Sequence, residues 1–284
     1  MQVYLAGTRG SAPITSPQHA HYGGDTSGLL IEGARGETIL LDAGSGTPAL
    51  ASRLGDDPDL FVLFTHFHLD HLIGLATFQP LYTPKARLCF AAPPTDGMDV
   101  ETALRGFFRS PYWPIDLDRA GAQISFGDLP SSSGGSPLRI GGLEVRWVPV
   151  PHPGGCTGYR IDEPATGASL VLATDAEWAN APDHLREGFL GLCRDPKPCD
   201  VLICDGQYAP EEAALRQGWG HSAWNDAVDL ANTAGVGQLL ITHHDPGADD
   251  STLQERETQL QAALPGAALA RQGQELVLPR KDTP

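Results

Sequence analysis

The sequence predicts a folded α/β protein, and two features of it lead to that prediction. Short apolar, β-like segments alternate with helix-like segments along the 284 residues, which is typical of α/β folds. Hydrophobic residues make up 41% of the sequence, whereas a disordered chain is poor in them. Both halves of the chain supply strands followed by helices, so we expect two sheets with helices outside them.

The first half is expected to hold strands and one transition from strand to helix. Three β-like segments come first, at residues 2–6, 28–33 and 37–44. The apolar strand at residues 60–64 is then expected to lead into a helix after residue 70.

The second half repeats this alternation after a Pro-rich middle. A Ser- and Gly-rich segment at residues 130–137 has the composition of a linker, but the strands on both sides of it carry parts of one His and Asp set. We therefore interpret it as a surface loop within one domain of residues 1–284. Strands are expected at residues 143–150, 158–162, 169–175, 200–208 and 238–244 and near the C-terminus, and helices at 222–234 and 252–263.

The charge of the chain argues against large nucleic acids as partners. Its formal net charge is −16, with only 19 Lys and Arg residues, whereas nucleic-acid binders usually present a basic surface. A small anion remains compatible, because bound dications can reverse the local field. The first residues lack a secretory signal and no segment has the roughly 20 apolar residues that cross a bilayer, so we expect a cytoplasmic protein without a membrane partner.

The strongest chemical signal is a cluster of metal-competent side chains directly after the strand at residues 60–64. His66 and His68 are two residues apart, so an extended backbone directs both to one side. Asp70 and His71 follow at the expected helix start and approach from another direction. Imidazole and carboxylate groups bind zinc and related ions, and the absence of thiolates favours a site that stays open to water. This arrangement suits two ions.

Three further candidate ligands follow later strands. They are His152, Asp175 and His243. Each alone has a structural alternative, a turn residue for the histidines and a helix cap for Asp175. Because all three stand at strand ends, we expect them to join the first cluster. His244 follows the same strand as His243 and remains an alternative to it.

The chain resembles the metallo-β-lactamase-fold superfamily, whose HxHxDH signature corresponds to residues 66–71. The resemblance implies an αββα sandwich of two mixed sheets flanked by helices. It assigns His66, His68 and His152 to one ion and Asp70, His71 and His243 to the other, with Asp175 bridging them. It also places Asp42 behind the ligands to orient one of them; a simple turn carboxylate is the alternative.

Two segments resemble the ribonuclease Z and cyclic-phosphodiesterase branch of this superfamily. They are residues 7–13 and Gly220-His221-Ser222. The resemblance implies that His221 assists the leaving oxygen and that the protein is a homodimer. We expect Asp205 to orient His221 and raise its pKa. A helix cap or a packing role is the alternative for His221.

The chain departs from ribonuclease Z where that enzyme has a long basic arm. Residues 106–114 are aromatic and Pro-rich instead and carry one arginine. We expect an active-site flap near residues 100–118, in which Tyr112 or Trp113 stacks on a base and Arg109 lies near phosphate. Core packing is the alternative.

The expected mechanism is hydrolysis by a hydroxide that bridges two divalent ions about 3.5–4 Å apart, with Asp70, His221 and Asp205 as catalytic groups. Zinc is the expected metal, and manganese and iron are alternatives. The expected substrate is a small phosphodiester such as a cyclic nucleotide. Hydrolysis of a lactone, thioester or carboxylic ester is the first alternative, and a non-catalytic metal- or nucleotide-binding protein is the second.

Overall fold

The protein forms two stacked seven-stranded sheets, seen in a computed structural model that describes residues 1–279. The first sheet contains β1 (Gln2–Gly7), β2 (Gly28–Glu32), β3 (Thr38–Leu41), β4 (Asp59–Leu63), β5 (Arg87–Ala92), β6 (Gln123–Asp128) and β14 (Glu275–Val277). Its order is β14-β1-β2-β3-β4-β5-β6. Strands β3 to β6 run parallel, and β14, β1, β2 and β3 pair antiparallel, so the sheet is mixed.

The second sheet is also mixed. It contains β7 (Leu138–Ile140), β8 (Leu143–Val150), β9 (Cys156–Glu163), β10 (Ala168–Ala173), β11 (Val201–Asp205), β12 (Leu239–Thr242) and β13 (Ala268–Leu269). The order is β13-β12-β11-β10-β9-β8-β7, with β10 to β13 parallel. The Ser- and Gly-rich loop at residues 130–137 runs from β6 in the first sheet to β7 in the second.

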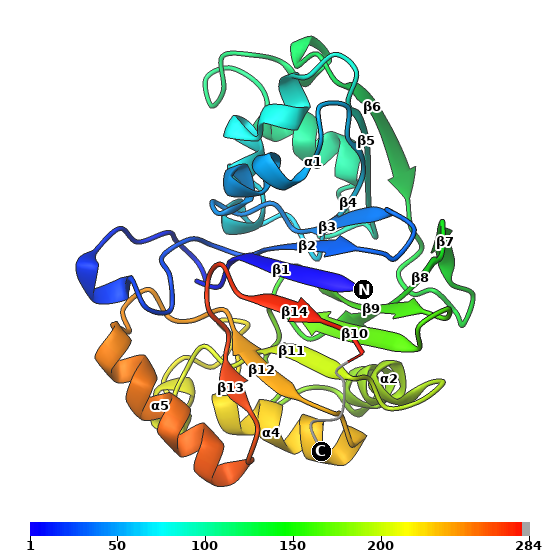
Figure 1. Ribbon diagram of the computed structural model, residues 1–284. Helices are drawn as coiled ribbons and strands as arrows, with labels where there is room; N and C mark the ends of the chain where they lie inside the picture. Colours follow the sequence, from blue (N-terminus) through cyan, green and yellow to red (C-terminus); the bar gives the residue numbers. More distant parts are fainter. Residues whose placement is uncertain (280–284) are drawn as a thin grey trace.

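Helices cover the outer faces of both sheets, as Figure 1 shows. The α-helices are α1 (Val100–Phe107), α2 (Asp183–Arg194), α3 (Pro210–Ala213), α4 (Trp224–Ala234) and α5 (Asp250–Ala263). The 3₁₀ helices are η1 (Pro17–His19), η2 (Thr47–Arg53), η3 (Leu69–His71), η4 (Ile73–Thr77), η5 (Gln79–Tyr82) and η6 (Leu117–Arg119). This sandwich confirms the expected fold class. Within residues 1–279, no helix combines the length and apolarity needed to cross a membrane.

Three apolar clusters hold the layers together. The middle one lies between the sheets and joins side chains such as Leu29 and Leu41 of the first to Leu170 and Ile203 of the second. A second cluster packs α2, α4 and α5 on the second sheet, and a third packs α1 and several 3₁₀ helices on the first. The strands between these layers are buried on both faces, which explains their nearly continuous apolar sequences.

The expected helix after residue 70 is wrong in type. The chain forms two short 3₁₀ helices there, η3 and η4, instead of an α-helix. The backbone N–H of Gly74 donates to the carbonyl of Ala43 at 2.9 Å and so leaves the helical pattern. A Cβ at Gly74 would lie 1.9 Å from the carbonyl oxygen of Gly44, so the close approach of these two segments of the chain requires glycine.

The other expected helices are confirmed with small shifts. Helix α4 begins at Trp224 instead of Ser222, and α5 begins at Asp250 instead of Thr252. The Asp249 side chain accepts a hydrogen bond from the Thr252 N–H and thereby caps α5. The helices α1, α2 and α3 and the strands β5 to β7 were not expected from the sequence.

Candidate metal centre

The candidate residues meet where chain segments leave the strands at one edge of the sandwich. The HxHxDH segment follows β4, and His152 follows β8. Asp175 and His243 follow β10 and β12, two parallel strands with β11 between them. The carboxyl ends of parallel strands reach the same edge of a sheet, where α/β proteins generally bind their ligands.

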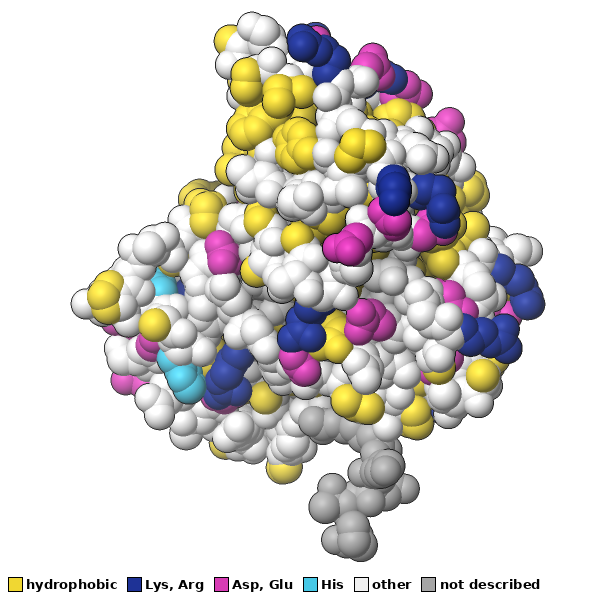
Figure 2. All heavy atoms as spheres, turned by 45° about the horizontal axis from the view of Figure 1, so that its top comes forward, with side chains coloured by type: hydrophobic (Ala, Val, Ile, Leu, Met, Phe, Trp, Pro, Cys, Tyr) yellow, Lys and Arg dark blue, Asp and Glu magenta, His cyan; other side chains and the backbone are white. Residues whose placement is uncertain are grey.

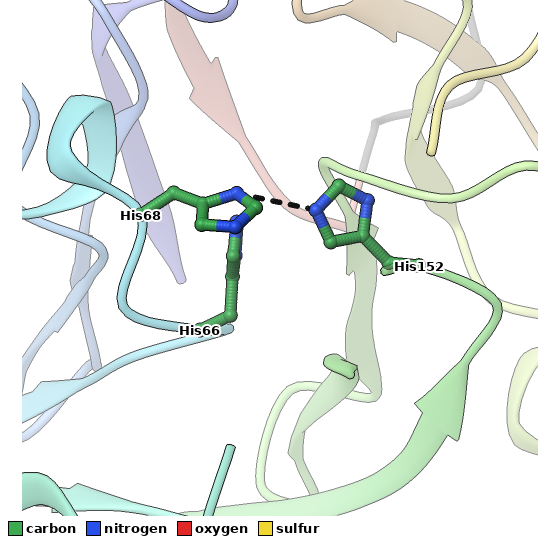
Figure 3. Close-up of side chains that lie close together, drawn as sticks. All are labelled: His66, His68 and His152. Carbon is green, nitrogen blue, oxygen red and sulfur yellow. Dashed lines mark hydrogen bonds between the residues drawn. The ribbon is translucent and has the colours of Figure 1, made fainter. Parts of the chain in front are cut away.

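His66, His68 and His152 form one potential ligand group, in which one ligand atom from each lies within 4.8 Å of the others. Figure 3 shows the three imidazoles turned toward one another. The closest approach joins His152 Nε2 and His68 Nδ1 at 3.3 Å. His66 is fully buried, whereas His68 is exposed at the mouth of the site.

Asp70, His71 and His243 form a second group on the inner side of the first. The Oδ2 atom of Asp70 lies 3.3 Å from His71 Nε2 and 3.4 Å from His243 Nε2. Asp175 lies between the two groups. Its carboxylate is 3.1 Å from His71 Nε2, 3.2 Å from His243 Nε2 and 3.8 Å from His66 Nε2.

The chemistry of these donors fits two divalent ions. Ligand atoms about 2.0–2.2 Å from a tetrahedral ion lie roughly 3.3–3.6 Å apart, and three of the separations above are 3.3–3.4 Å. Hydrogen bonds between such groups are usually shorter. Within residues 1–279, no hydrogen-bond partner is found for five buried atoms of the cluster, His66 Nε2, His71 Nε2, Asp175 Oδ1 and both ring nitrogens of His243. Buried polar atoms without partners are rare in folded proteins, and metal ligation would satisfy all of these except His243 Nδ1.

The electrostatics of the inner group also fit a cation. Burial opposes protonation of His71, but the surrounding carboxylates, above all Asp175 and Asp70, raise the pKa of His71 well above its usual value. Burial would raise the pKa of Asp175, but the imidazoles of His243 and His71 hold it well below the usual range. The pocket thus stabilises positive charge among its carboxylates, and a metal ion would supply that charge.

Asp42 lies behind the candidate ligand His71. Its carboxylate accepts hydrogen bonds from the Thr65 N–H at 2.8 Å and the Thr65 hydroxyl at 2.9 Å. It also contacts His71 Nδ1 at 2.8 Å, which leaves Nε2 of that ring directed at the cluster. Asp42 and His243 both adopt a positive φ, at 57° and 61°. Such strain in residues other than glycine is typical of functional sites.

The structure separates His243 from His244. His243 joins the ligand cluster, whereas His244 turns away and places Nε2 2.8 Å from the carbonyl oxygen of Ala270. Burial lowers the pKa of His244 to about 3. His244 therefore belongs to the core behind the site.

Asp205 and His221 form a pair at the rim of the cluster. His221 Nδ1 lies 2.9 Å from Asp205 Oδ2, and the His221 ring stacks on that of His243 with centroids 4.7 Å apart. Burial lowers the pKa of His221, but the charge and the hydrogen bond of Asp205, together with the charges of Asp175 and Asp70, raise it above its usual value. A protonated imidazole in this position can donate a proton through Nε2, the nitrogen that Asp205 does not use.

Two supporting groups were missed in the sequence. The backbone N–H of Ser11 donates to Asp70 Oδ2 at 2.8 Å. A Cβ at Gly10 would lie 2.2 Å from His243 Nδ1, so the N-terminal loop packs its backbone directly on this imidazole. The sequence of this loop gives no sign of these contacts, because neither Ser11 nor Gly10 makes them through a side chain.

Part of the segment that we expected to form a flap, residues 100–118, lines an apolar groove together with the HxHxDH segment. The groove has a volume of about 500 Å³, and its lining includes Tyr112 and Trp113 as well as Phe67 and Leu69. Trp113 also packs edge-to-face on Phe108 with centroids 6.4 Å apart, so it contributes to the core as well. Arg109 is exposed and does not line the groove.

The lining of the groove includes exposed apolar side chains. Figure 2 shows hydrophobic side chains gathered on the upper lobe of the molecule, around α1. Tyr112, Leu69 and Met98 are the most exposed large apolar residues that line the groove. A contiguous apolar surface next to a polar cluster is typical of a binding site.

The fold and the sequence agree with those of known proteins. The family model described as "Beta-lactamase superfamily domain" matches residues 37–244. Ribonuclease BN of Escherichia coli strain IAI39 is 26% identical over 283 residues, covering 81% of this chain and 86% of that protein.

Two solved structures superpose on nearly the whole chain. The metallo-β-lactamase-fold protein YhfI from Bacillus subtilis has a TM-score of 0.71 and 18% identity, covering 97% of this chain and 99% of that one. A diphosphatase from the PhnP family has a TM-score of 0.69 and 21% identity, with 97% of both chains covered. These likenesses show a shared fold. Because the family model matches most of its length, the chain belongs to the metallo-β-lactamase superfamily.

Proposed function

We propose that this metal-dependent hydrolase cleaves a small phosphodiester, such as a cyclic nucleotide. The observation that carries the proposal is the Asp205–His221 pair, whose imidazole lies against the ligand cluster. Hydrolysis of a phosphodiester with a sugar hydroxyl as leaving group benefits from an acid in this position. The names of two relatives, a ribonuclease and a diphosphatase, support phosphoryl chemistry.

The two ligand groups would hold one ion each. His66, His68 and His152 would bind the outer ion, Asp70, His71 and His243 the inner one, and Asp175 would contact both. Zinc is the first choice for these donors, and manganese and iron also fit. The ions would supply a hydroxide at neutral pH and neutralise charge on the phosphoryl oxygens. Asp42 and Ser11 hold ligands in place from behind.

His221 would protonate the leaving oxygen. Asp205 holds Nδ1 of the ring and stabilises the imidazolium form. Asp205 is itself fixed, since it accepts hydrogen bonds from the backbone N–H groups of Ala176 at 3.1 Å and Gln207 at 3.0 Å. The acid is thereby oriented before substrate binds, which is the arrangement that acid catalysis requires.

The groove would bind the ring of the substrate. Tyr112 and Trp113 offer aromatic faces, and the groove lining is apolar. The net charge of −16 argues against large RNA as substrate. Arg109 would act only at the edge of a bound substrate, because it lies outside the groove lining.

A second candidate function is hydrolysis of a lactone, thioester or carboxylic ester. The apolar groove favours it, because an acyl chain would bury apolar surface there. The same pair of ions would polarise a carbonyl group. In that reaction His221 would contribute little.

A substrate panel separates these candidates. The metal-loaded protein should cleave cyclic nucleotides and bis-p-nitrophenyl phosphate, and leave lactones and thioesters nearly untouched. His221→Ala should lower cyclic-nucleotide turnover about 100-fold or more, in the usual range for loss of a general acid. It should affect bis-p-nitrophenyl phosphate much less, because nitrophenolate leaves without a proton.

The matched control is His184→Ala, which removes an exposed histidine of α2 and should change nothing. Turnover of lactones or thioesters that survives His221→Ala would contradict the phosphodiester proposal.

A further inference from the structure

Glu177 stands two residues after Asp175, and its side chain contacts the segment Gly218–Gly220. Its backbone N–H donates to the carbonyl of Pro151 at 2.7 Å, the residue directly before His152. Glu177 therefore connects the chain segment of Asp175 with that of His152. Glu177 is not a candidate metal ligand itself, because it belongs to none of the potential ligand groups within residues 1–279.

The carboxylate of Glu177 binds the backbone of a glycine loop. The Gly218 N–H lies 2.8 and 2.9 Å from its two oxygens, and the Gly220 N–H lies 2.8 Å from Oε2. Both glycines have a positive φ, 81° and 91°. An anion that accepts several backbone N–H groups fixes the loop that supplies them, since such charge-assisted bonds are strong.

The loop held in this way touches two functional histidines. The carbonyl of Gly220 lies 2.9 Å from His152 Nδ1 and accepts its proton, which directs Nε2 of His152 to the ligand group. A Cβ at Gly220 would lie only 2.3 Å from the same nitrogen, so the backbone and the ring are in tight contact. His221 is the next residue in the chain and continues from this fixed point to Asp205.

The geometry points to Glu177 as a positioning residue that aligns both His152 and His221 through the Gly218–Gly220 loop. This inference rests on the proposed function for His221, and on the ligand assignment alone for His152. In this role Glu177 would act through the loop and not by binding a metal ion or the substrate itself. Through the loop, Glu177 connects His152, a candidate ligand of the outer ion, with His221, the proposed general acid.

Metal affinity tests the first half of the inference. Glu177→Ala should weaken zinc at the outer site about 10- to 100-fold, the usual effect of losing a group that orients a ligand. The inner site should keep its affinity. Competition with a chromophoric chelator measures both constants without any turnover. Glu177→Gln keeps one acceptor oxygen and should restore part of the loss.

Leaving-group dependence tests the second half. With zinc saturating, a series of methyl aryl phosphates with increasingly basic phenols is hydrolysed by each variant. If Glu177 acts through His221, Glu177→Ala should slow the poorest leaving group at least 10-fold more than the best one. The rate of the double variant Glu177→Ala/His221→Ala should depend on the basicity of the leaving group no more steeply than the rate of His221→Ala alone. Glu187→Ala, which removes an exposed glutamate of α2, is the control.

Two results would overturn the inference. Unchanged zinc affinity in Glu177→Ala would remove the link to His152, and an equal loss on all leaving groups would remove the link to His221. If the wild-type protein cleaves no phosphodiester at all, the proposed function fails, and the zinc titration still decides the role of Glu177 toward His152.

Discussion

The two halves of the candidate site differ in how firmly the fold holds them. The inner half is buried, with Asp42, His71 and His243 at 0% exposure, and Asp175 between the halves is 2% exposed. The outer half opens to solvent beyond the buried His66, because His68 is exposed and Tyr112 has 72% of its surface accessible. Asp42 and His243 directly follow β3 and β12, whereas Tyr112 lies in the segment after α1. The metal chemistry therefore depends on the fold, whereas substrate choice depends on segments that can vary without disturbing it.

The largest effect is expected at the boundary between the halves, at Asp175. Asp175→Asn removes the negative charge that lies 3.1 to 3.8 Å from three imidazoles. Two dications without a shared anion repel each other strongly in a buried site. We expect loss of one ion and a fall in turnover of about 1,000-fold or more, measured by metal analysis and kinetics. A variant that kept two ions and half its activity would show that Asp175 does not join the halves.

A smaller but still large effect is expected from one methyl group in the inner half. In Gly10→Ala the new Cβ would lie 2.2 Å from His243 Nδ1, so the imidazole or the loop must move. Zinc affinity at the inner site should fall roughly 100-fold, because ligand geometry would be lost. Gly55→Ala is the control, since its Cβ would meet no atom within 4 Å. If Gly10→Ala bound zinc as tightly as Gly55→Ala, the buried inner half would be able to accommodate the added methyl group without loss of ligand geometry, contrary to this account.

Asp42→Asn should have an intermediate effect. The amide can still accept from Thr65, but it no longer stabilises His71 as a carboxylate does. We expect a loss of about 10- to 100-fold in zinc affinity at the inner site and little change in substrate KM. Chelator competition measures the first quantity and steady-state kinetics the second. A KM effect without loss of metal would assign Asp42 to substrate binding instead.

The smallest effects are expected in the outer half. Tyr112→Ala should raise KM for substrates with a ring by about 5-fold and leave kcat and zinc content unchanged, because stacking contributes about 1 kcal/mol. Arg109→Ala should change KM less than about 3-fold, since Arg109 does not line the groove. A larger effect of Arg109 than of Tyr112 would reverse the order in which we place these residues beside the substrate.

The same contrast explains what the sequence could predict. The sequence could predict candidate ligands at strand ends, because apolar strands precede His66, Asp175 and His243, and it could predict the fold class from the alternation of strands and helices. The sequence could not decide between His243 and His244, because the backbone of His243, with its positive φ, decides which of the two rings turns inward. Glu177 carried no signal, since its partners are backbone N–H groups. Nor could the sequence show that Gly74 crosses the Ala43–Gly44 segment and prevents an α-helix.

The most direct test of the account is a calorimetric titration of the chelator-treated protein with zinc. Two ions per chain in the wild-type protein, of which His68→Ala loses one and keeps the other, would agree with an outer and an inner site. A single ion per chain, or loss of both ions in His68→Ala, would contradict the division of the site into two halves.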